Sequence, residues 1–181
     1  MKWEAITMNE SVFDRLEKLL KLQKLPFSVA RHKPVYTSED AAAVRGVPLS
    51  SGAKALICKG EDQFVMFVIP ADRKLDSKQV RRLCGWRKLR FANRDEVLTL
   101  TGLTPGAIPP FGSLFGLPTF CDQNLGENKT INFNAGDHTI SVSMMYADYF
   151  EAERPELGTF TDVGTFGGDA DDQVEQTSRD D

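Results

Sequence analysis

Residues 101–112 combine three glycines and three prolines, a composition suited to presenting backbone N–H groups to a ligand. Glycine reaches positive φ without steric cost, while proline fixes φ near −65° and lacks an N–H group. Each residue before a proline is also pushed out of the helical region. We therefore expect a stiff loop that is neither helix nor strand. Such a loop is either a surface connector or a backbone surface that binds a ligand at close range.

Lys54 lies near the start of residues 53–59, a run typical of a strand that is apolar between Lys54 and the terminal Lys59. The period of two places Lys54 on the same face as Leu56 and Cys58. A lysine in this place is usually a strand-edge charge whose stem lies on apolar surface while its ammonium reaches water. The alternative is a cation that positions a carbonyl-containing group of a ligand.

Residues 134–138 combine Asn134, Gly136 and an acid with His138. Asparagine, glycine and aspartate are the residue types expected in a hairpin turn, so a purely structural turn is one interpretation. The other is a pocket in which the imidazole of His138 donates or accepts a hydrogen bond.

Residues 73–94 carry nine cations and one acid, Asp76. A solvated surface is usually mixed in sign, whereas a nearly single-signed run suits contact with a phosphate backbone. Trp86 adds a ring on which a base could stack. A merely soluble face is the alternative.

Three cysteines and two histidines are too few and too scattered for a zinc signature or a disulfide framework. No cysteine has a histidine at the spacing of a nucleophile motif. We therefore expect no metal site, and a redox protein that uses Cys58 or Cys121 is the least supported alternative.

The chain of 181 residues has a formal net charge of −4 that is unevenly distributed. Residues 162–181 hold seven acids and one arginine, a net of −6, so the remainder carries +2 and suits an anionic partner. This acidic segment is too poor in aliphatic residues to offset its ordering entropy. The chain lacks an apolar run of about 18 residues or more. Residues 1–9 also lack a secretory pattern. We expect a soluble protein of a reducing compartment, with no membrane partner.

Cap residues followed by apolar residues at the helical period predict helices over residues 11–22, 38–44, 77–83 and 93–100, and a last helix is predicted over residues 145–153. Alternating or continuous apolar runs predict strands over residues 27–31, 53–59, 64–69, 88–91, 117–121, 130–133 and 138–142. Strands mostly adjoin other strands, which predicts a mixed α/β fold of α+β type rather than a Rossmann sheet.

Six short motifs follow one another along the chain: TSEDAA at 37–42, GAKAL at 52–56, FVIPADRKLD at 67–76, TGLTPGAIPPFG at 101–112, LPTFCD at 117–122 and NAGDH at 134–138. Each is weak alone, but the series resembles the YbaK/ProX-type aminoacyl-tRNA deacylases over residues 10–150. These are free-standing relatives of the editing domain inserted in bacterial prolyl-tRNA synthetase.

The resemblance implies a curved mixed β-sheet with flanking helices in one domain, residues 11–155. An N-terminal extension, 1–10, would precede it, and an acidic tail, 156–181, would follow as a disordered segment. It also implies a cytoplasmic enzyme that hydrolyses the ester joining a wrong, small amino acid to tRNA, without metal or organic cofactor. Its nucleophile would be water, or a hydroxyl or thiol of the substrate.

The family's active-site lysine falls on Lys54, and its GxxxP loop falls on residues 106–110. In this role the backbone N–H groups of Gly106, Ala107 and Ile108 would stabilise the tetrahedral intermediate. Lys54 would orient the acceptor end of the tRNA or the aminoacyl group. Five further residues would border the substrate: Pro109, Pro110, Asn134, Gly136 and His138.

Within the basic run, four cations are expected to contact the tRNA: Lys78, Arg81, Arg82 and Lys88. The partners implied are mischarged tRNA and, in addition, an aminoacyl-tRNA synthetase. A non-catalytic tRNA-binding module within a synthetase assembly is the alternative, since a fold does not determine a function.

Overall fold

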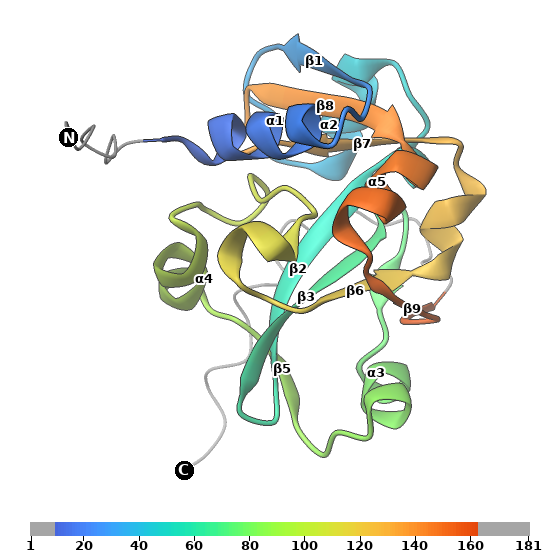
Figure 1. Ribbon diagram of the computed structural model, residues 1–181. Helices are drawn as coiled ribbons and strands as arrows, with labels where there is room; N and C mark the ends of the chain where they lie inside the picture. The colour runs from blue at the N-terminus through green and yellow to red at the C-terminus, as the bar shows by residue number, and fades with distance from the viewer. Residues whose placement is uncertain (1–9, 163–181) are drawn as a thin grey trace, which may run out of the picture.

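The computed structural model describes residues 10–162, and side-chain caps mark where its first four helices begin (Figure 1). The caps are Ser11, Thr37, Asp76 and Asn93, and each accepts a backbone N–H of the first turn. The helices are α1 (Val12–Leu22), α2 (Ser38–Arg45), α3 (Ser77–Cys84), α4 (Arg94–Thr101) and α5 (Tyr146–Glu153). The predicted helices agree with these within two residues. In the described part of the chain, none is long and apolar enough to cross a membrane.

A three-stranded antiparallel sheet has the order β1-β8-β7, formed by β1 (Phe27–Arg31), β8 (Ile140–Met145) and β7 (Thr130–Asn134). Residues on β7 and β8 alternate between an apolar face and a polar face. The apolar face carries Ile131, Phe133, Val142 and Met144, which are buried in the core. The polar face carries Asn132, Asn134, Ser141 and Ser143.

A five-stranded sheet has the order β5-β2-β3-β6-β9. Its strands are β5 (Leu89–Phe91), β2 (Ala53–Gly60), β3 (Gln63–Pro70), β6 (Thr119–Asp122) and β9 (Glu156–Gly158). β2 pairs antiparallel with β3 and β5, whereas β6 pairs parallel with β3 and β9. The prediction of a mixed sheet is therefore confirmed. β4 (Lys74–Leu75) and β10 (Thr161–Asp162) form a separate antiparallel pair.

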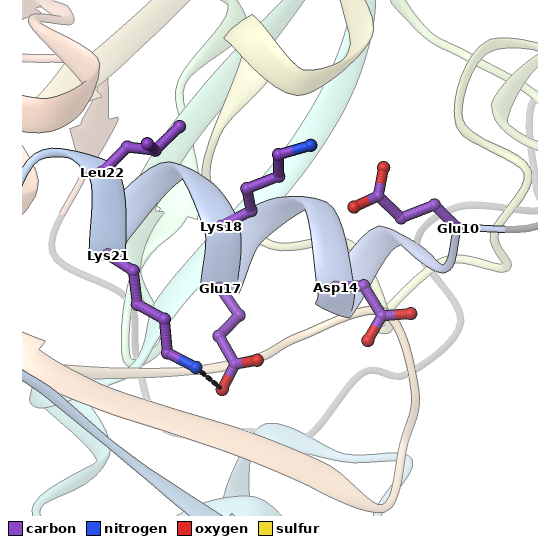
Figure 2. Close-up of a pocket in the computed structure, with 6 residues that line it drawn as sticks. All are labelled: Glu10, Asp14, Glu17, Lys18, Lys21 and Leu22. Atoms are coloured by element: carbon purple, nitrogen blue, oxygen red, sulfur yellow. Dashed lines mark ion pairs between the residues drawn. The ribbon is translucent and has the colours of Figure 1, made fainter. Parts of the chain in front are cut away.

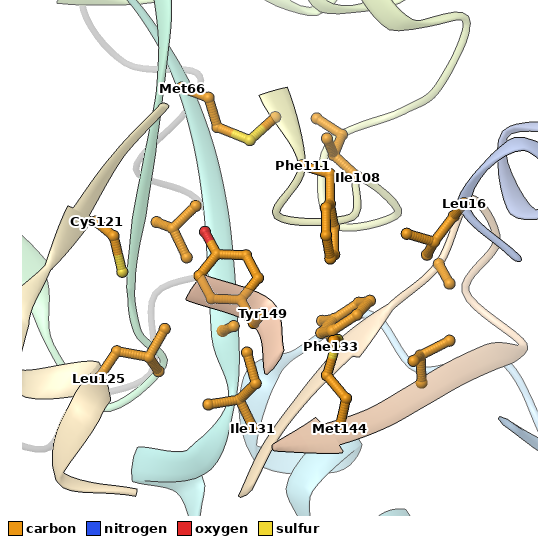
Figure 3. Close-up of a cluster of buried hydrophobic side chains, with 14 of the residues drawn as sticks. Leu16, Met66, Ile108, Phe111, Cys121, Leu125, Ile131, Phe133, Met144 and Tyr149 are labelled. Atoms are coloured by element: carbon orange, nitrogen blue, oxygen red, sulfur yellow. The ribbon is translucent and has the colours of Figure 1, made fainter. Parts of the chain in front are cut away.

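The larger hydrophobic cluster joins the two sheets and includes the end of the stiff loop (Figure 3). Phe111 is fully buried, with its ring centroid 5.8 Å from that of Phe133 and 5.3 Å from that of Tyr149. Burial of one such side chain stabilises a fold by roughly 1.5–3 kcal/mol. A smaller cluster covers the other face of the five-stranded sheet, so β3 is buried on both faces as predicted.

The C-terminal boundary predicted at residue 155 is too early. Residues 156–162 form β9 and β10, and Phe160 is only 2% exposed within the smaller cluster. The buried carboxylate of Asp122 accepts the Phe160 N–H at 2.7 Å and the Thr161 hydroxyl at 2.9 Å. These long-range contacts hold a segment whose own composition predicted disorder. The remainder of the predicted tail, 163–181, and residues 1–9 lie outside the described residues.

Two other features differ from prediction, the start of one strand and the presence of short 3-10 helices. β8 begins at Ile140 rather than at residue 138, because His138 belongs to the turn after β7. Short 3-10 helices, η1 (Leu49–Ser51), η2 (Gly112–Phe115) and η3 (Gln123–Glu127), precede β2, β6 and β7 in segments for which the sequence predicted no helix.

Candidate active site

The stiff loop between α4 and η2 contains a tight turn followed by a buried segment. The Ala107 N–H donates to the Thr104 carbonyl at 3.2 Å across Pro105 and Gly106, whose φ is +87°. Proline then glycine at the central positions is the signature of a type II turn. Ala107, Ile108, Pro109 and Pro110 are all buried. The loop is therefore anchored in the core and is more than a surface connector.

The turn between β7 and β8 holds two consecutive carbonyls of this loop. Asn134 Nδ2 donates to the Gly106 carbonyl at 2.9 Å, and the Gly136 N–H donates to the Ala107 carbonyl at 2.7 Å. Carbonyl and N–H point in opposite directions across a trans peptide. The Gly136 bond therefore turns the Ile108 N–H away from the β7–β8 turn.

Two of the three predicted backbone donors remain candidates for binding a ligand, and of these Gly106 is exposed whereas Ile108 is only 6% exposed. Within residues 10–162 the N–H groups of Gly106 and Ile108 have no protein acceptor. Ala107 differs from the prediction because its N–H closes the turn to Thr104. The arrangement can stabilise a negative oxygen that approaches the loop between Gly106 and Ile108.

His138 packs against the turn of the loop and is held at both ring nitrogens. Nδ1 lies 3.0 Å from the Val35 carbonyl and Nε2 lies 3.2 Å from the Thr104 hydroxyl. Because a carbonyl only accepts, Nδ1 carries the proton that is donated to Val35. A Cβ added at Gly106 would lie 3.2 Å from His138 Cε1. Glycine is thus required at 106 by both its positive φ and the nearby ring.

Arg45, which no motif in the sequence marks, binds side chains on the polar face of the three-stranded sheet. From the last turn of α2 it donates through Nη2 to Asn134 Oδ1 at 2.7 Å and through Nε to Ser141 Oγ at 2.8 Å. His32 Nε2 lies 2.6 Å from the same hydroxyl. Burial lowers the pKa of Arg45 to about 10, which still leaves it charged at neutral pH. In the sequence a basic residue in a last helical turn indicates only a favourable helix dipole.

Lys54 lies near the junction of the two sheets. Gly52, two residues earlier, forms a parallel bridge with Asn132, and Asn132 Nδ2 donates to Ser51 Oγ at 3.0 Å. Because the bridge is parallel, the two chain segments run in the same direction from it. Lys54 lies two residues after Gly52, and Asn134 lies two residues after Asn132. The half-buried Lys54 faces Ile69 across the hairpin.

The predicted alternation of β2 is confirmed by its neighbours. Leu56 and Cys58 belong to the smaller cluster, whereas Ala53 and Ile57 pack with Ile108 in the larger one. The face of β2 that carries Lys54 is therefore opposite the face that meets the loop. Contact between Lys54 and a substrate held at the loop requires its long stem to reach around the start of β2.

The basic run lies at the other end of the molecule. Figure 1 shows α3 at the opposite end from β7 and β8. Lys78, Arg81, Arg82 and Lys88 are exposed, as binding to a polyanion requires. By contrast Arg90 forms two 2.7 Å hydrogen bonds with Glu96 and is neutralised.

Trp86 does not form the open stacking surface that its position in the basic run predicted. Its ring covers Gly60 and packs edge-on against Phe67 and Phe120. It is part of the edge of the smaller cluster.

A surface depression and the buried cysteines do not contribute to the candidate site. A shallow depression is lined entirely by α1 and the residue two before it, and its Lys21 and Glu17 form a 3.2 Å ion pair (Figure 2). Burial raises the pKa of the Cys58 and Cys121 thiols to about 12, so neither supplies a thiolate near neutral pH. Among residues 10–162, no three His, Cys, Asp or Glu side chains gather as metal ligands.

Comparison with known proteins places these features in one family. Residues 32–152 match the model of the aminoacyl-tRNA editing domain. The chain is 38% identical over 151 residues to the multifunctional Ser/Thr-tRNA deacylase ProXp-y of Escherichia coli K12, covering 81% of this chain and 90% of that protein. It is 27% identical to the prolyl-tRNA editing protein ProX of Acetoanaerobium sticklandii, covering 83% and 93%. The crystal structure of hypothetical protein APE2540 superposes with a TM-score of 0.75 at 25% identity, covering 82% and 99%. The chain belongs to the aminoacyl-tRNA editing domain family.

Proposed function

We propose that this protein hydrolyses the ester of tRNA mischarged with a small amino acid, acting as a free-standing editing enzyme. The observation that carries the proposal is the loop at residues 106–108. The Ile108 N–H is fixed in direction because the Ala107 carbonyl of the same peptide binds Gly136, and the Gly106 N–H is fixed by the turn that joins Thr104 to Ala107. Donors that are oriented before the reaction stabilise a developing oxyanion without reorganising.

In the proposed reaction a water oxygen adds to the ester carbonyl carbon at the loop. The carbonyl oxygen becomes the oxyanion that accepts from Gly106 and Ile108. The bond between this carbon and the ribose oxygen then breaks, and the ribose oxygen receives the proton that the water loses. The products are the free amino acid and tRNA with a free terminal hydroxyl. Lys54 supplies a positive charge that orients the acceptor end.

The proposed substrates carry small side chains. The name of the Escherichia coli relative specifies seryl and threonyl esters, which differ by one methyl group. A pocket distinguishes such side chains by only about 1–3 kcal/mol per methylene. The remaining borders of the proposed pocket are Pro109, Pro110 and His138. We propose two partners. The first is mischarged tRNA, and the second is an aminoacyl-tRNA synthetase that produces the wrong ester.

The experiment that tests the function is a panel of correctly and wrongly charged tRNAs, labelled on the amino acid. Loss of label under single-turnover conditions is measured for seryl, threonyl, alanyl, cysteinyl and prolyl esters. We expect rapid loss from at least one wrongly charged tRNA and none from its correctly charged counterpart. Tight binding of the panel without any hydrolysis would contradict catalysis and identify a tRNA-binding module instead.

A further inference from the structure

Tyr36 is a large aromatic residue that the fold displays to solvent beside the candidate active site. Its side chain is 71% exposed. The neighbouring Val35 is buried, and its N–H donates to the His138 carbonyl at 3.1 Å. On the other side Thr37 caps α2 by accepting the Asp40 N–H at 3.0 Å. The backbone of Tyr36 is therefore fixed on both sides while its ring is left open.

The ring of Tyr36 leans on the histidine of the site. Its centroid lies 4.8 Å from that of His138, with 40° between the planes. His138 in turn lies against Gly106 and binds Thr104, at the turn of the loop. His138 therefore lies between the exposed ring of Tyr36 and the turn that carries the proposed oxyanion donor Gly106. A single exposed tyrosine is ordinary on a protein surface. A tyrosine whose backbone is fixed beside the candidate active site is in a position to contact a bound substrate.

We propose that Tyr36 is a stacking platform for the base of the 3′-terminal nucleotide of the tRNA. This inference rests on the proposed function, in which the ester hangs on the ribose of that nucleotide. The acceptor end is single-stranded, and unpaired bases are bound by stacking on aromatic side chains. A base stacked on Tyr36 holds its ribose beside His138 and presents the ester to Gly106 and Ile108. The exposed Lys33, three residues earlier, is placed to meet the adjoining phosphate.

The test compares Tyr36→Ala, Tyr36→Phe and a matched control, Phe150→Ala, which removes a 37% exposed ring from α5. Each variant is assayed on three esters of the same amino acid: charged tRNA, the aminoacyl ester of adenosine, and the ethyl ester. We expect Tyr36→Ala to raise KM about tenfold for the first two and to leave the ethyl ester unchanged. Tyr36→Phe and Phe150→Ala should behave as the unchanged protein on all three.

Two results would overturn the platform. One is an unchanged KM of Tyr36→Ala for the adenosine ester. The other is an equal loss on all three esters, which would mean that Tyr36 acts through the position of His138 alone. Binding of an uncharged oligonucleotide ending in CCA, measured by calorimetry, separates this proposal from the proposed function. Suppose that the protein hydrolyses no ester, and that the oligonucleotide nevertheless binds about tenfold more weakly to Tyr36→Ala. The stacking platform is then supported, and the proposed hydrolytic function is contradicted. If hydrolysis occurs and this binding does not depend on Tyr36, the platform alone fails.

Discussion

The Nη2 atom of Arg45 lies 2.7 Å from Oδ1 of Asn134, and this contact fixes which way the asparagine amide faces. Arginine has no acceptor, so the amide oxygen must be the atom turned toward it. The Nδ2 atom is then the one that donates to the Gly106 carbonyl at 2.9 Å. A half-buried cation on α2 therefore helps to determine how the loop at Gly106, the proposed site of catalysis, is held.

Replacement of Asn134 by Asp tests this chain of contacts. A carboxylate keeps the bond to Arg45 but has no hydrogen for the Gly106 carbonyl, and two acceptors would face each other. We expect hydrolysis in a single turnover to fall at least tenfold, while the thermal midpoint changes little because the new ion pair offsets the lost bond. Ser143→Ala, on the same polar face, is the control and should retain activity. An Asn134→Asp variant with full activity would show that the loop does not depend on this bond.

Lys54→Ala tests the proposed cation of the site. We expect the single-turnover rate to fall at least tenfold, which corresponds to about 1.4 kcal/mol or more in the barrier. Far-ultraviolet circular dichroism should be unchanged, since the side chain is only half-buried. Lys59→Ala is the matched control, because Lys59 lies on the same strand with its Nζ 5.4 Å from the ring centroid of Phe64. Equal activity of Lys54→Ala and Lys59→Ala would remove Lys54 from the mechanism.

Gly106→Val and Gly102→Val form a pair that separates backbone strain from the site. Both glycines have positive φ, where a side chain costs about 1–2 kcal/mol. An added Cβ meets nothing within 4 Å at Gly102 but meets His138 at Gly106. We expect both variants to lose stability, Gly106→Val the more because of its contact with His138, and only Gly106→Val to lose turnover while still binding tRNA. Parallel loss of binding and turnover in Gly106→Val would make the loop a docking surface.

The double variant Lys78→Glu with Arg82→Glu tests the distant basic surface on α3. Phosphate contacts make affinity fall as salt rises, so their removal should raise KM for charged tRNA severalfold and flatten its salt dependence. Hydrolysis of the adenosine ester should be unchanged, because α3 lies at the other end of the molecule from the loop. Lys18→Glu with Lys21→Glu on α1 is the control for net charge. The same affinity and salt slope in the α3 variant would identify this face as ordinary solvated surface.

Truncation measures the contribution of the C-terminal strands. A chain ending at residue 155 loses the buried Phe160 and leaves the Asp122 carboxylate buried without the Phe160 and Thr161 donors. Loss of a buried phenylalanine side chain alone destabilises a protein by about 3–5 kcal/mol. We expect a chain ending at 162 to keep its urea midpoint and a chain ending at 155 to unfold at much lower urea. Equal urea midpoints of the two truncated chains would support the domain boundary at residue 155 that the sequence predicted.

The features that the sequence by itself determined are those decided by neighbouring residues. Ser11 and Asn93 predict helix starts because a cap bonds an N–H only three residues away. The stiffness of the loop at 101–112 follows likewise from the φ restrictions of its own prolines and glycines. The order of the six motifs also indicated the family, because the order of motifs along a chain can be seen in the sequence itself.

Tertiary structure decided the contacts that join distant parts of the chain. Arg45 meets Asn134 and Ser141 across 89 and 96 residues, and nothing around Arg45 in the sequence marks either partner. β9 is held by parallel pairing with β6, so its own composition could not distinguish it from a tail. Ala107 is different, because its N–H bonds Thr104 only three residues earlier, and Pro105 followed by Gly106 already indicates that turn in the sequence. Local conformational preferences act over a few residues, whereas the site is made by side chains and carbonyls that only packing of the whole domain brings together.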